Sequence, residues 1–268
     1  MVNLAVNGAA GRMGRQLLAA IAERDDARLS AASDAPGQSC IGLDASLLSG
    51  GQPNGVLVTD QMEKAAAQSD VIIDFTAPAV SLALLDALGQ SDTRVVIGTT
   101  GFTSEQIERL HQHAASRPIV FAPNYSIGVT VTLALLQQAA KALGDDYDVE
   151  VIEAHHRHKV DAPSGTAIKM GEVVAQALGR DLEECAIYGR QGITGERKTK
   201  TIGFETIRAG DIIGDHTVLF AGNGERIEVT HKATDRMTFA RGAVRSAIWL
   251  ADQPAGLYDM THVLGINN

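Results

Sequence analysis

The chain has 268 residues, of which 45% are hydrophobic and 21% are charged, and its formal net charge is −9 at pH 7. This length accommodates one large domain or two modest ones, and the composition is ordinary for a globular protein. The negative charge argues against a protein that wraps nucleic acid, and two cysteines provide neither a disulfide framework nor a set of zinc ligands.

Export and membrane insertion are also not expected. Residues 1–14 have neither a basic segment nor a long apolar core, so they do not resemble a signal peptide. The apolar run at 127–140 is interrupted by Gly128 and by threonines and glutamines, and it is shorter than the roughly 20 residues of a membrane-spanning helix. We therefore expect a cytoplasmic protein with reduced cysteines and no membrane contact.

A glycine-rich turn follows the first predicted strand. Residues 2–6 form an apolar run typical of a buried strand, 15–24 have helical spacing, and GAAGRMG stands between them at 8–14. A strand, a glycine turn and a helix can bind a dinucleotide, because glycine lets the backbone approach a pyrophosphate and the helix N-terminus stabilises its charge. The spacing G-x-x-G-x-x-G is not the usual one, so an ordinary tight turn remains an alternative.

An acidic residue supports the dinucleotide interpretation. Residues 27–33 are predicted as a second strand, and Asp34 follows it directly, 20 residues beyond Gly14. Such folds hold the adenosine ribose with an acid at about this distance. Residues 35–55, rich in Gly, Ser, Pro and Asn, are predicted as a long loop.

Strands and helices then alternate along the chain. We predict strands at 56–59, 71–75, 94–97 and 119–122, and helices at 61–68 and 104–115. A further helix is predicted to follow residues 76–78 and to end at residue 88. This alternation predicts a Rossmann-like, doubly wound parallel sheet, whose ligands bind beyond the carboxyl ends of the strands. Clusters of small residues fall at those ends, at 8–14, 74–78, 98–102 and 122–126.

The rest of the chain is organised differently. We predict a helix over 127–143, a strand over 148–155, a helix from near Ser164, a loop over 189–200, strands at 201–208, 216–221 and 227–231, and a helix over 237–250. Several strands after one helix predict a mixed or antiparallel sheet in an α+β domain. We therefore expect a dinucleotide-binding domain at 1–126, completed by 237–268, and a substrate-binding domain at 127–236.

The densest group of reactive side chains lies in EAHHRHKVDAPSGTA, residues 153–167. Three histidines, Arg157 and Lys159 occupy positions 155–159, and a Pro-Ser-Gly-Thr step opens the next helix. Cationic and titratable side chains before a helix N-terminus suit an anionic small molecule. The pattern itself leaves open a solvated basic turn followed by a capped helix.

This string resembles the signature of the dihydrodipicolinate reductases of bacterial lysine biosynthesis, and the resemblance extends from Val2 to the C-terminus. The other motifs are GAAGRMG (8–14), DFTAP (74–78), GTTGF (98–102), APNYS (122–126), TGERKTKTIGF (194–204), RAGDIIGDHT (208–217) and RMTFARGAVRSAIWL (236–250). The resemblance implies hydride transfer from NADH or NADPH to a cyclic imine dicarboxylate, 4-hydroxy-tetrahydrodipicolinate. The product would be tetrahydrodipicolinate, in the diaminopimelate and lysine pathway.

The resemblance also implies roles for individual residues. His155 is the implied acid/base group and Lys159 the implied proton donor. The implied contacts of the substrate carboxylates are His156, Gly165 and Thr166. The implied cofactor contacts are Gly8, Ala9, Ala10, Gly11, Arg12, Met13, Asp34, Gly98, Thr99, Thr100, Ala122, Pro123, Asn124 and Tyr125. The family further implies a homotetramer joined through the sheets of the second domains, and no metal ion is expected.

One position departs from the family pattern. Members that bind NADPH well often have an arginine directly after the ribose-binding acid, and this chain has Ala35 there. Arginine suits a 2′-phosphate because its planar fork makes paired, charge-assisted hydrogen bonds. Arg12 lies in the neighbouring turn, so the choice between NADH and NADPH stays open.

Acidic and histidine side chains outside the implied set have simpler interpretations. Glu153 and Asp161 are expected to orient the basic cluster. The remaining histidines stand in no motif that assigns them a role, and we expect them on the surface or satisfied in the core: His111, His113, His216, His231 and His262.

Two other classes of function compete with a reductase. A metal-dependent hydrolase could use His155, His156 and His158, but adjacent residues of a strand point to opposite faces, and no H-E-x-x-H motif is present. A regulator could keep the fold and sense a dinucleotide without catalysis. Such a sensor has no use for Lys159 and three histidines beside a helix start that binds carboxylates.

Overall fold

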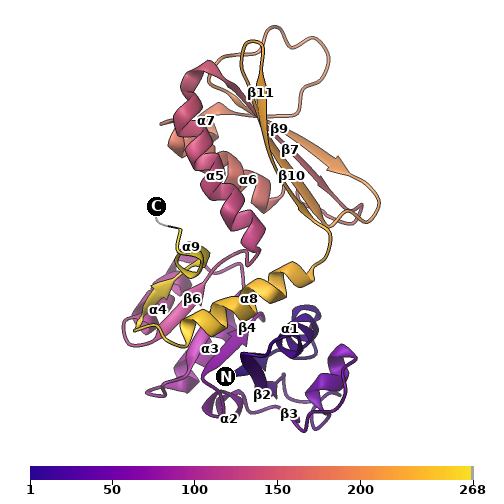
Figure 1. Cartoon of the computed structure of the whole chain (residues 1–268), viewed down its shortest axis with the longest axis vertical. Helices are drawn as coiled ribbons and strands as arrows, with labels where there is room; N and C mark the ends of the chain where they lie inside the picture. The colour runs from indigo at the N-terminus through magenta and orange to yellow at the C-terminus, as the bar shows by residue number, and fades with distance from the viewer. Residues whose placement is uncertain (267–268) are drawn as a thin grey trace. The chain divides into compact units, whose positions relative to one another are not determined.

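The computed structural model describes residues 1–266, which form two compact units. The first unit combines Met1–Ile127 with the described residues from Met237 onward, and the second unit is Gly128–Arg236. Each unit is built around a sheet of its own (Figure 1). The chain therefore leaves the first unit, builds the second and then returns to complete the first.

The first unit contains a parallel sheet of seven strands in the order β12-β6-β5-β4-β1-β2-β3. The strands are β1 (Val2–Asn7), β2 (Ala27–Ser33), β3 (Val58–Thr59), β4 (Val71–Asp74), β5 (Arg94–Ile97), β6 (Pro118–Phe121) and β12 (Gly256–Tyr258). The strand order reverses between β1 and β4, so the topological switch point lies there. The predicted Rossmann-like, doubly wound sheet is confirmed.

Helices cover both faces of this sheet because successive strand residues point to opposite sides. Leu4 and Val6 pack in the cluster that includes α1 (Arg12–Ala22) and α8 (Met237–Leu250). Ala5 belongs to the cluster on the other face. The helices that contribute to that second cluster are α2 (Met62–Ala67), α3 (Pro78–Leu88) and α4 (Ser104–Ala114).

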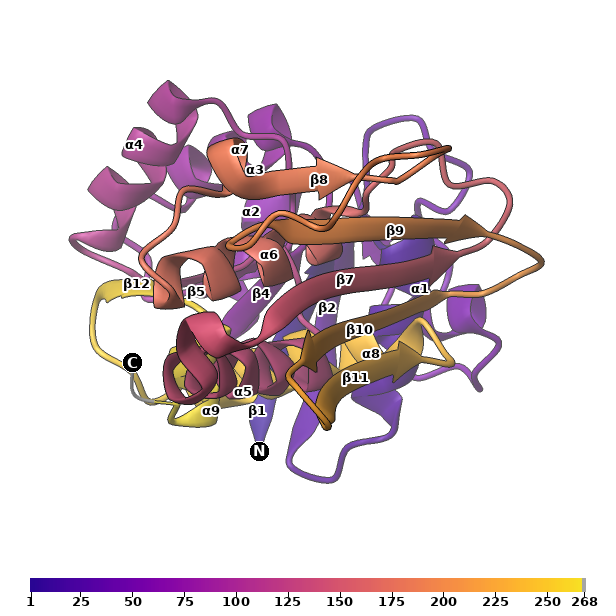
Figure 2. The same ribbon diagram turned by 90° about the horizontal axis from the view of Figure 1, so that it is seen from above.

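The second unit contains a mixed sheet of five strands in the order β11-β10-β7-β9-β8, which Figure 2 shows side by side. Its strands are β7 (Asp148–His155), β8 (Ala186–Tyr188), β9 (Ile202–Arg208), β10 (Gly214–Ala221) and β11 (Arg226–Ala233). The central strand β7 pairs antiparallel with β10 and parallel with β9. This agrees with the mixed sheet that the sequence predicts for an α+β domain.

The helix that opens the second unit has the predicted bounds, and a 3-10 turn extends it beyond the apolar run at 127–140. α5 (Ile127–Leu143) continues into the 3-10 helix η2 (Gly144–Asp146), and the 20-residue run is long and apolar enough to cross a membrane by length and composition. Our estimate that this run is too short was therefore wrong. Leu136 and Ala140 are buried in the core of the second unit, together with residues of β7 and α6 (Gly165–Ala177).

Several short elements were not predicted. They are the 3-10 helix η1 (Ala45–Ser49), α7 (Leu182–Cys185), β8, β12 and α9 (Met260–Leu264). η1 lies inside the predicted loop, where Asp44 caps it by accepting a hydrogen bond from Ser46 N at 3.0 Å. Elements of three to five residues are too short to show a periodicity.

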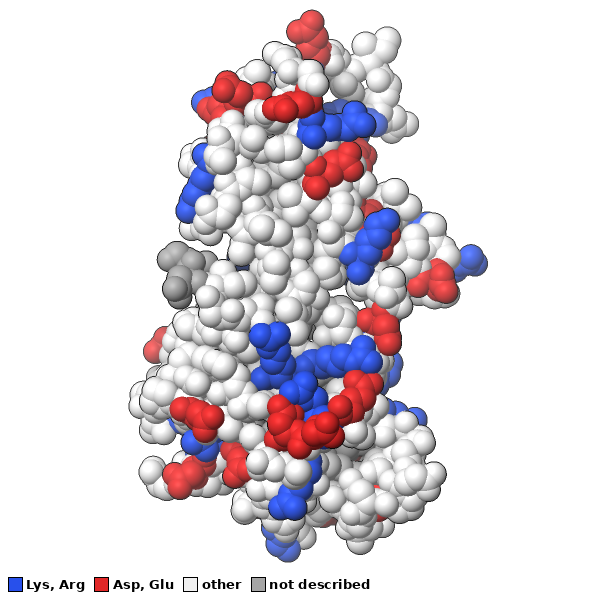
Figure 3. Space-filling view, in the orientation of Figure 1, with Lys and Arg blue, Asp and Glu red and all other residues white. Residues whose placement is uncertain are grey.

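Charged side chains of opposite sign are interspersed on the face shown in Figure 3. In the first unit, Arg24 pairs with Asp26 at 2.5 Å and Arg241 pairs with Glu23 at 2.8 Å. Exposed pairs of this kind contribute little to stability, roughly 0–1 kcal/mol each.

Candidate active site

The glycine turn of the first unit lies directly beyond β1. Gly8 has φ of +75°, and the backbone N–H groups of Gly8 and Ala9 donate to Ser33 O at 2.8 and 3.0 Å. A Cβ atom on Gly14 would lie 2.1 Å from Gly8 O, so only glycine lets α1 begin this close to the turn. The N-cap residue is Gly11, which has no side chain to occupy the helix N-terminus. The first N–H groups of α1 can therefore face a pyrophosphate.

Asp34 lies at the same edge of the sheet, beyond β2. Its Oδ2 accepts a hydrogen bond from Ala10 N at 2.7 Å, and its Oδ1 accepts one from Ala35 N at 2.8 Å. Arg15 Nε donates to Ala10 O at 3.0 Å, so its guanidinium lies beside the same turn. The structure thus brings Asp34 and the predicted pyrophosphate turn into direct contact.

A buried polar network occupies the switch point and joins the carboxyl ends of neighbouring strands. Asp74 Oδ1 accepts hydrogen bonds from Asn7 Nδ2 and Thr76 Oγ1, both at 2.8 Å, and its other oxygen accepts from Ser81. Thr99 Oγ1 lies 2.9 Å from Ser81 Oγ and accepts a hydrogen bond from Thr76 N at 3.0 Å. Burial raises the pKa of Asp74, against the opposing effect of these hydrogen bonds. The network fixes Thr99 relative to the glycine turn.

The remaining predicted cofactor residues follow β5 and β6. Gly98 packs on the Phe75 ring, which a Cβ atom there would meet at 2.1 Å. Thr100 and Pro123 are exposed, Gly98 and Asn124 are half-buried, and Ala122 is buried. Tyr125 is 1% exposed, and its hydroxyl donates toward the carbonyl oxygens of Ile97 and Val120 at 2.8 and 3.1 Å. Tyr125 is thus part of the core, and its carbonyl oxygen packs closely against Gly242 of α8, so its side chain is not available to a ligand.

In the second unit, β7 delivers His155 into a buried hydrogen-bond network. His155 Nδ1 lies 2.5 Å from Glu153 Oε2, and Glu153 is 1% exposed. Arg208 pairs with both oxygens of Glu153 at 2.8 Å. Burial raises the pKa of Glu153, but the hydrogen bonds from Arg208, His155 and Ser164 outweigh it and the pKa is lowered. Glu153 is therefore ionised at neutral pH.

The start of α6 adjoins this network. Ser164 caps the helix by accepting a hydrogen bond from Ala167 N at 3.2 Å, and its backbone N–H donates to Glu153 Oε1 at 3.0 Å. Ser164 Oγ also lies 2.9 Å from His216 Nε2. Gly165 is exposed and Thr166 is half-buried. Glu153 therefore forms hydrogen bonds both with His155 and with the start of the helix that is predicted to bind carboxylates.

Lys159 and His156 lie on the turn that connects β7 to α6. Lys159 Nζ pairs with Asp161 at 2.9 Å, and 21% of the lysine side chain is exposed. His156 Nε2 lies 3.3 Å from Arg236 Nη2. Partial burial and the charge of Arg236 lower the pKa of His156. His156 thus contacts the guanidinium group of Arg236, whereas His155 contacts the carboxylate of Glu153, so the two adjacent histidines have different environments.

Sequence reasoning missed Arg208 and His216. Both belong to one motif, RAGDIIGDHT, but no local pattern indicates their partners. Strand register does: β9 places Arg208 opposite His155, and β10 places His216 opposite Glu153. The expectation for His216 was correct only in that it is buried, because its ring also packs edge-on against His155 at 5.0 Å. Of the two acids expected to orient the cluster, Glu153 contacts His155 and Asp161 contacts Lys159.

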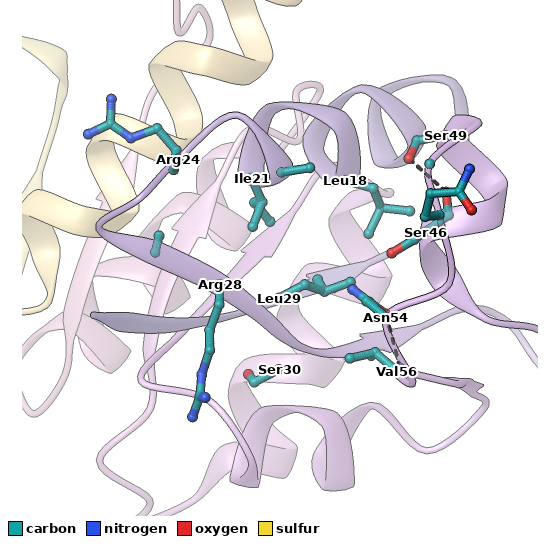
Figure 4. A pocket seen from close by; sticks show the side chains of 14 residues that line it. Leu18, Ile21, Arg24, Arg28, Leu29, Ser30, Ser46, Ser49, Asn54 and Val56 are labelled. Carbon is teal, nitrogen blue, oxygen red and sulfur yellow. Dashed lines mark hydrogen bonds between the residues drawn. The ribbon is translucent and has the colours of Figure 1, made fainter.

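A hollow of about 670 Å³ lies elsewhere in the first unit, against α1, the start of β2 and η1 (Figure 4). Leu18, Ile21 and Leu29 line it, and Figure 4 shows the Arg24 and Arg28 side chains directed away from them. Its lining contains none of the residues predicted to hold the cofactor.

Comparisons with known proteins cover both units. Residues 2–125 match the family described as dihydrodipicolinate reductase, N-terminus, and residues 128–264 match dihydrodipicolinate reductase, C-terminus. The 4-hydroxy-tetrahydrodipicolinate reductase of Alkalilimnicola ehrlichii is 57% identical over 263 residues, which cover 98% of each chain. That of Hahella chejuensis is 56% identical over 266 residues, covering 99% of this chain and 100% of the relative. A dipicolinate-bound dihydrodipicolinate reductase from Paenisporosarcina superimposes with a TM-score of 0.77 at 27% identity, over 100% of both chains.

Proposed function

The chain belongs to the dihydrodipicolinate reductase family and reduces 4-hydroxy-tetrahydrodipicolinate with a nicotinamide dinucleotide, and we propose which residues carry out each part of this reaction. The first unit, residues 1–126 with the segment from 237 onward, holds the dinucleotide. The second unit, residues 127–236, holds the dicarboxylate. The basic segment 153–167 carries this proposal, because it combines cations, a buried histidine and a helix N-terminus. The alternative of a non-catalytic dinucleotide sensor has no support.

The turn at 8–13 suits the pyrophosphate. Its glycines keep side chains away from the phosphates, and the N-terminus of α1 stabilises negative charge there. Asp34 accepts a hydrogen bond from the adenosine ribose. Residues 98–100 and 122–125 flank the nicotinamide, which supplies the hydride when the cofactor is bound.

The second unit supplies charge and protons. The Thr166 hydroxyl and the backbone N–H groups at Gly165 and Thr166, together with His156, bind the substrate carboxylates. Lys159 donates the proton that accompanies hydride transfer, and Asp161 holds its ammonium group in place until then. The 4-hydroxyl group of the substrate leaves as water, which gives tetrahydrodipicolinate. His155 acts as the acid/base group, because a carboxylate on Nδ1 leaves Nε2 for proton transfer.

Cofactor choice rests on Asp34 and Ala35. The Asp34 carboxylate accepts hydrogen bonds from a ribose hydroxyl but repels a 2′-phosphate, and Ala35 offers no compensating charge. We propose that the enzyme uses NADH at least as well as NADPH. We further propose a cytoplasmic homotetramer joined through the sheets of the second units.

One assay tests the reaction and the assigned roles together. The enzyme receives freshly made condensation product of pyruvate and aspartate semialdehyde, and oxidation of NADH or NADPH is followed. His155→Ala and Lys159→Ala should each lower kcat by about 10²–10⁴, the usual range for acid–base groups. Dinucleotide binding should stay near that of wild type, because neither residue belongs to the first unit. Full kcat in either variant would show that its assigned role is wrong.

A further inference from the structure

Glu153 is the buried carboxylate around which the basic segment of the second unit is arranged. Its Oε2 meets His155 Nδ1 at 2.5 Å and Arg208 Nη1 at 2.8 Å. Its Oε1 accepts hydrogen bonds from Arg208 Nη2 at 2.8 Å and from Ser164 N at 3.0 Å. With 1% exposure, Glu153 is bound by protein groups on both oxygens.

These contacts determine which nitrogen of His155 carries the proton. An ionised carboxylate has acceptors only, so His155 Nδ1 must donate to Glu153. Neutral His155 then has its lone pair on Nε2. That nitrogen faces the backbone at position 214, where a Cβ atom would lie 3.1 Å away and glycine leaves the space open.

The same carboxylate is linked to the two other proposed functional groups. Its bond to Ser164 N fixes the N-cap of α6, next to Gly165 and Thr166. Arg208 Nη2 also donates to Asp161 O at 2.6 Å, and the Asp161 side chain pairs with Lys159. Glu153 thus connects the acid/base histidine, the turn of the proton donor and the start of the carboxylate-binding helix.

We infer that Glu153, supported by Arg208, is the positioning residue of the reaction: it holds His155 as the Nδ1–H tautomer and sets the start of α6. This inference rests on the proposed role of His155. It assigns Glu153 no contact with substrate, so Glu153 acts through His155 and Ser164.

Glu153→Gln is the direct test, because glutamine keeps the shape but has only one acceptor oxygen. The Oε1 position meets two groups that can only donate, Arg208 Nη2 and Ser164 N, whereas the Oε2 position meets one, Arg208 Nη1, beside His155. The amide nitrogen therefore takes the Oε2 position, where it loses the bond to Arg208 Nη1 but can donate to His155 Nδ1. We expect the histidine tautomer to switch to Nε2–H and kcat to fall by about 10²-fold or more. The KM for the dinucleotide should change by less than about twofold, since Glu153 lies outside the first unit.

Glu150→Gln is the matched control. Glu150 lies on the same strand, three residues earlier, and is also paired with arginines: Arg190 at 2.9 Å to both oxygens and Arg197 at 2.9 Å. It points to the opposite face of the sheet, so this variant loses a comparable ion pair and should keep wild-type kcat. Equal losses in both variants would overturn the inference, because they would reflect a loosened β7.

Nitrogen-15 NMR of the histidine rings shows which ring nitrogen carries the proton. If Glu153 served only the stability of the fold, its replacement would leave this tautomer unchanged. We expect wild-type His155 to carry its proton on Nδ1 and the Glu153→Gln variant to carry it on Nε2. An unchanged tautomer, or kcat within about twofold of wild type, would overturn the inference. If His155→Ala is inactive while Glu153→Gln is fully active, only the role of Glu153 fails. If His155→Ala is fully active, the proposed function of His155 fails instead.

Arg208→Lys repeats the test should Glu153→Gln fold poorly. Lysine keeps the positive charge and leaves the Glu153–His155 bond intact, but it lacks the planar fork that bonds both oxygens. We expect kcat to fall by about tenfold with His155 still protonated on Nδ1. Unchanged kcat in this variant would overturn the support assigned to Arg208.

Discussion

Replacing Ala35 by arginine should shift cofactor preference from NADH toward NADPH. Ala35 is exposed and directly follows Asp34, whose oxygens already accept backbone hydrogen bonds from Ala10 and Ala35. Because the Asp34 carboxylate already accepts these two hydrogen bonds, it competes less for the guanidinium group of a new arginine at position 35. The guanidinium group can then turn toward a 2′-phosphate at the rim of the glycine turn.

The size of the effect follows from one charge-assisted hydrogen bond. Such a bond contributes about 1.5–3 kcal/mol, and exposure to solvent reduces this to the lower end. Because about 1.4 kcal/mol corresponds to a factor of ten, we expect the NADPH/NADH ratio of kcat/KM to rise about tenfold. The shift should shrink at high salt, which screens exposed charges.

The assay compares both dinucleotides for wild type, Ala35→Arg and Ala35→Gln, at low and high ionic strength. Glutamine has a similar reach without the charge, so that variant should keep the wild-type ratio. A wild type strongly selective for NADPH, or an Ala35→Arg ratio that does not move, would refute the assignment of ribose recognition to this pair of residues.

Three further predictions concern substrate binding, stability and pH. Thr166→Val should raise the KM for the dicarboxylate about ten- to a hundred-fold, as expected for a hydrogen bond to a charged group, with dinucleotide binding unaffected; an unchanged KM would place the carboxylate elsewhere. Gly14→Ala should lower the free energy of unfolding by about 1–3 kcal/mol, seen as a lower midpoint of urea unfolding, because its Cβ would lie 2.1 Å from Gly8 O. Gly165→Ala is the control: its Cβ would meet nothing within 4 Å, so the midpoint should not change. Burial, and to a smaller extent charge on His155, lowers the pKa of His216 from 6.5 to about 4. As the pH falls from above 6.5 toward 4, the unfolded chain therefore binds a proton at His216 that the folded protein does not bind. Wild type should therefore lose about 2 kcal/mol more unfolding free energy than His216→Asn between pH 8 and pH 5, and equal losses would mean that His216 is protonated in the folded protein.

The alternation of strands and helices was sufficient to predict the parallel sheet and the edge where its small-residue clusters meet. Local patterns also indicated the helix start at Ser164, because capping residues and apolar spacing act over a few positions. They did not indicate that Arg208 and His216 lie beside Glu153. That depends on which strands pair and in which register, and β9 and β10 are more than 40 residues from β7 in sequence.

The network around Asp74 escaped prediction for a related reason. Asn7, Asp74 and Ser81 belong to three different elements, and each alone is an ordinary polar residue at the end of a strand or on a helix. Only the adjacency of β1 and β4 turns them into a buried hydrogen-bond network. The helix over 127–143 was predicted correctly, but the apolar run was ended at Ala140, whereas the helical segment continues through Asp146.

The interrupted order of the first unit has a consequence for synthesis on the ribosome. Its core needs Ala240, Ala243, Val244 and Leu250 of α8 to cover the face that Leu17 and Leu18 also pack against. Those residues emerge only after the whole of the second unit, which is continuous from Gly128 to Arg236. Because a nascent chain folds as its parts become complete, the second unit can finish before the first, although it is made later. A chain released after residue 236 would contain every strand of the second sheet and an N-terminal segment whose α1 still lacks its partner helix.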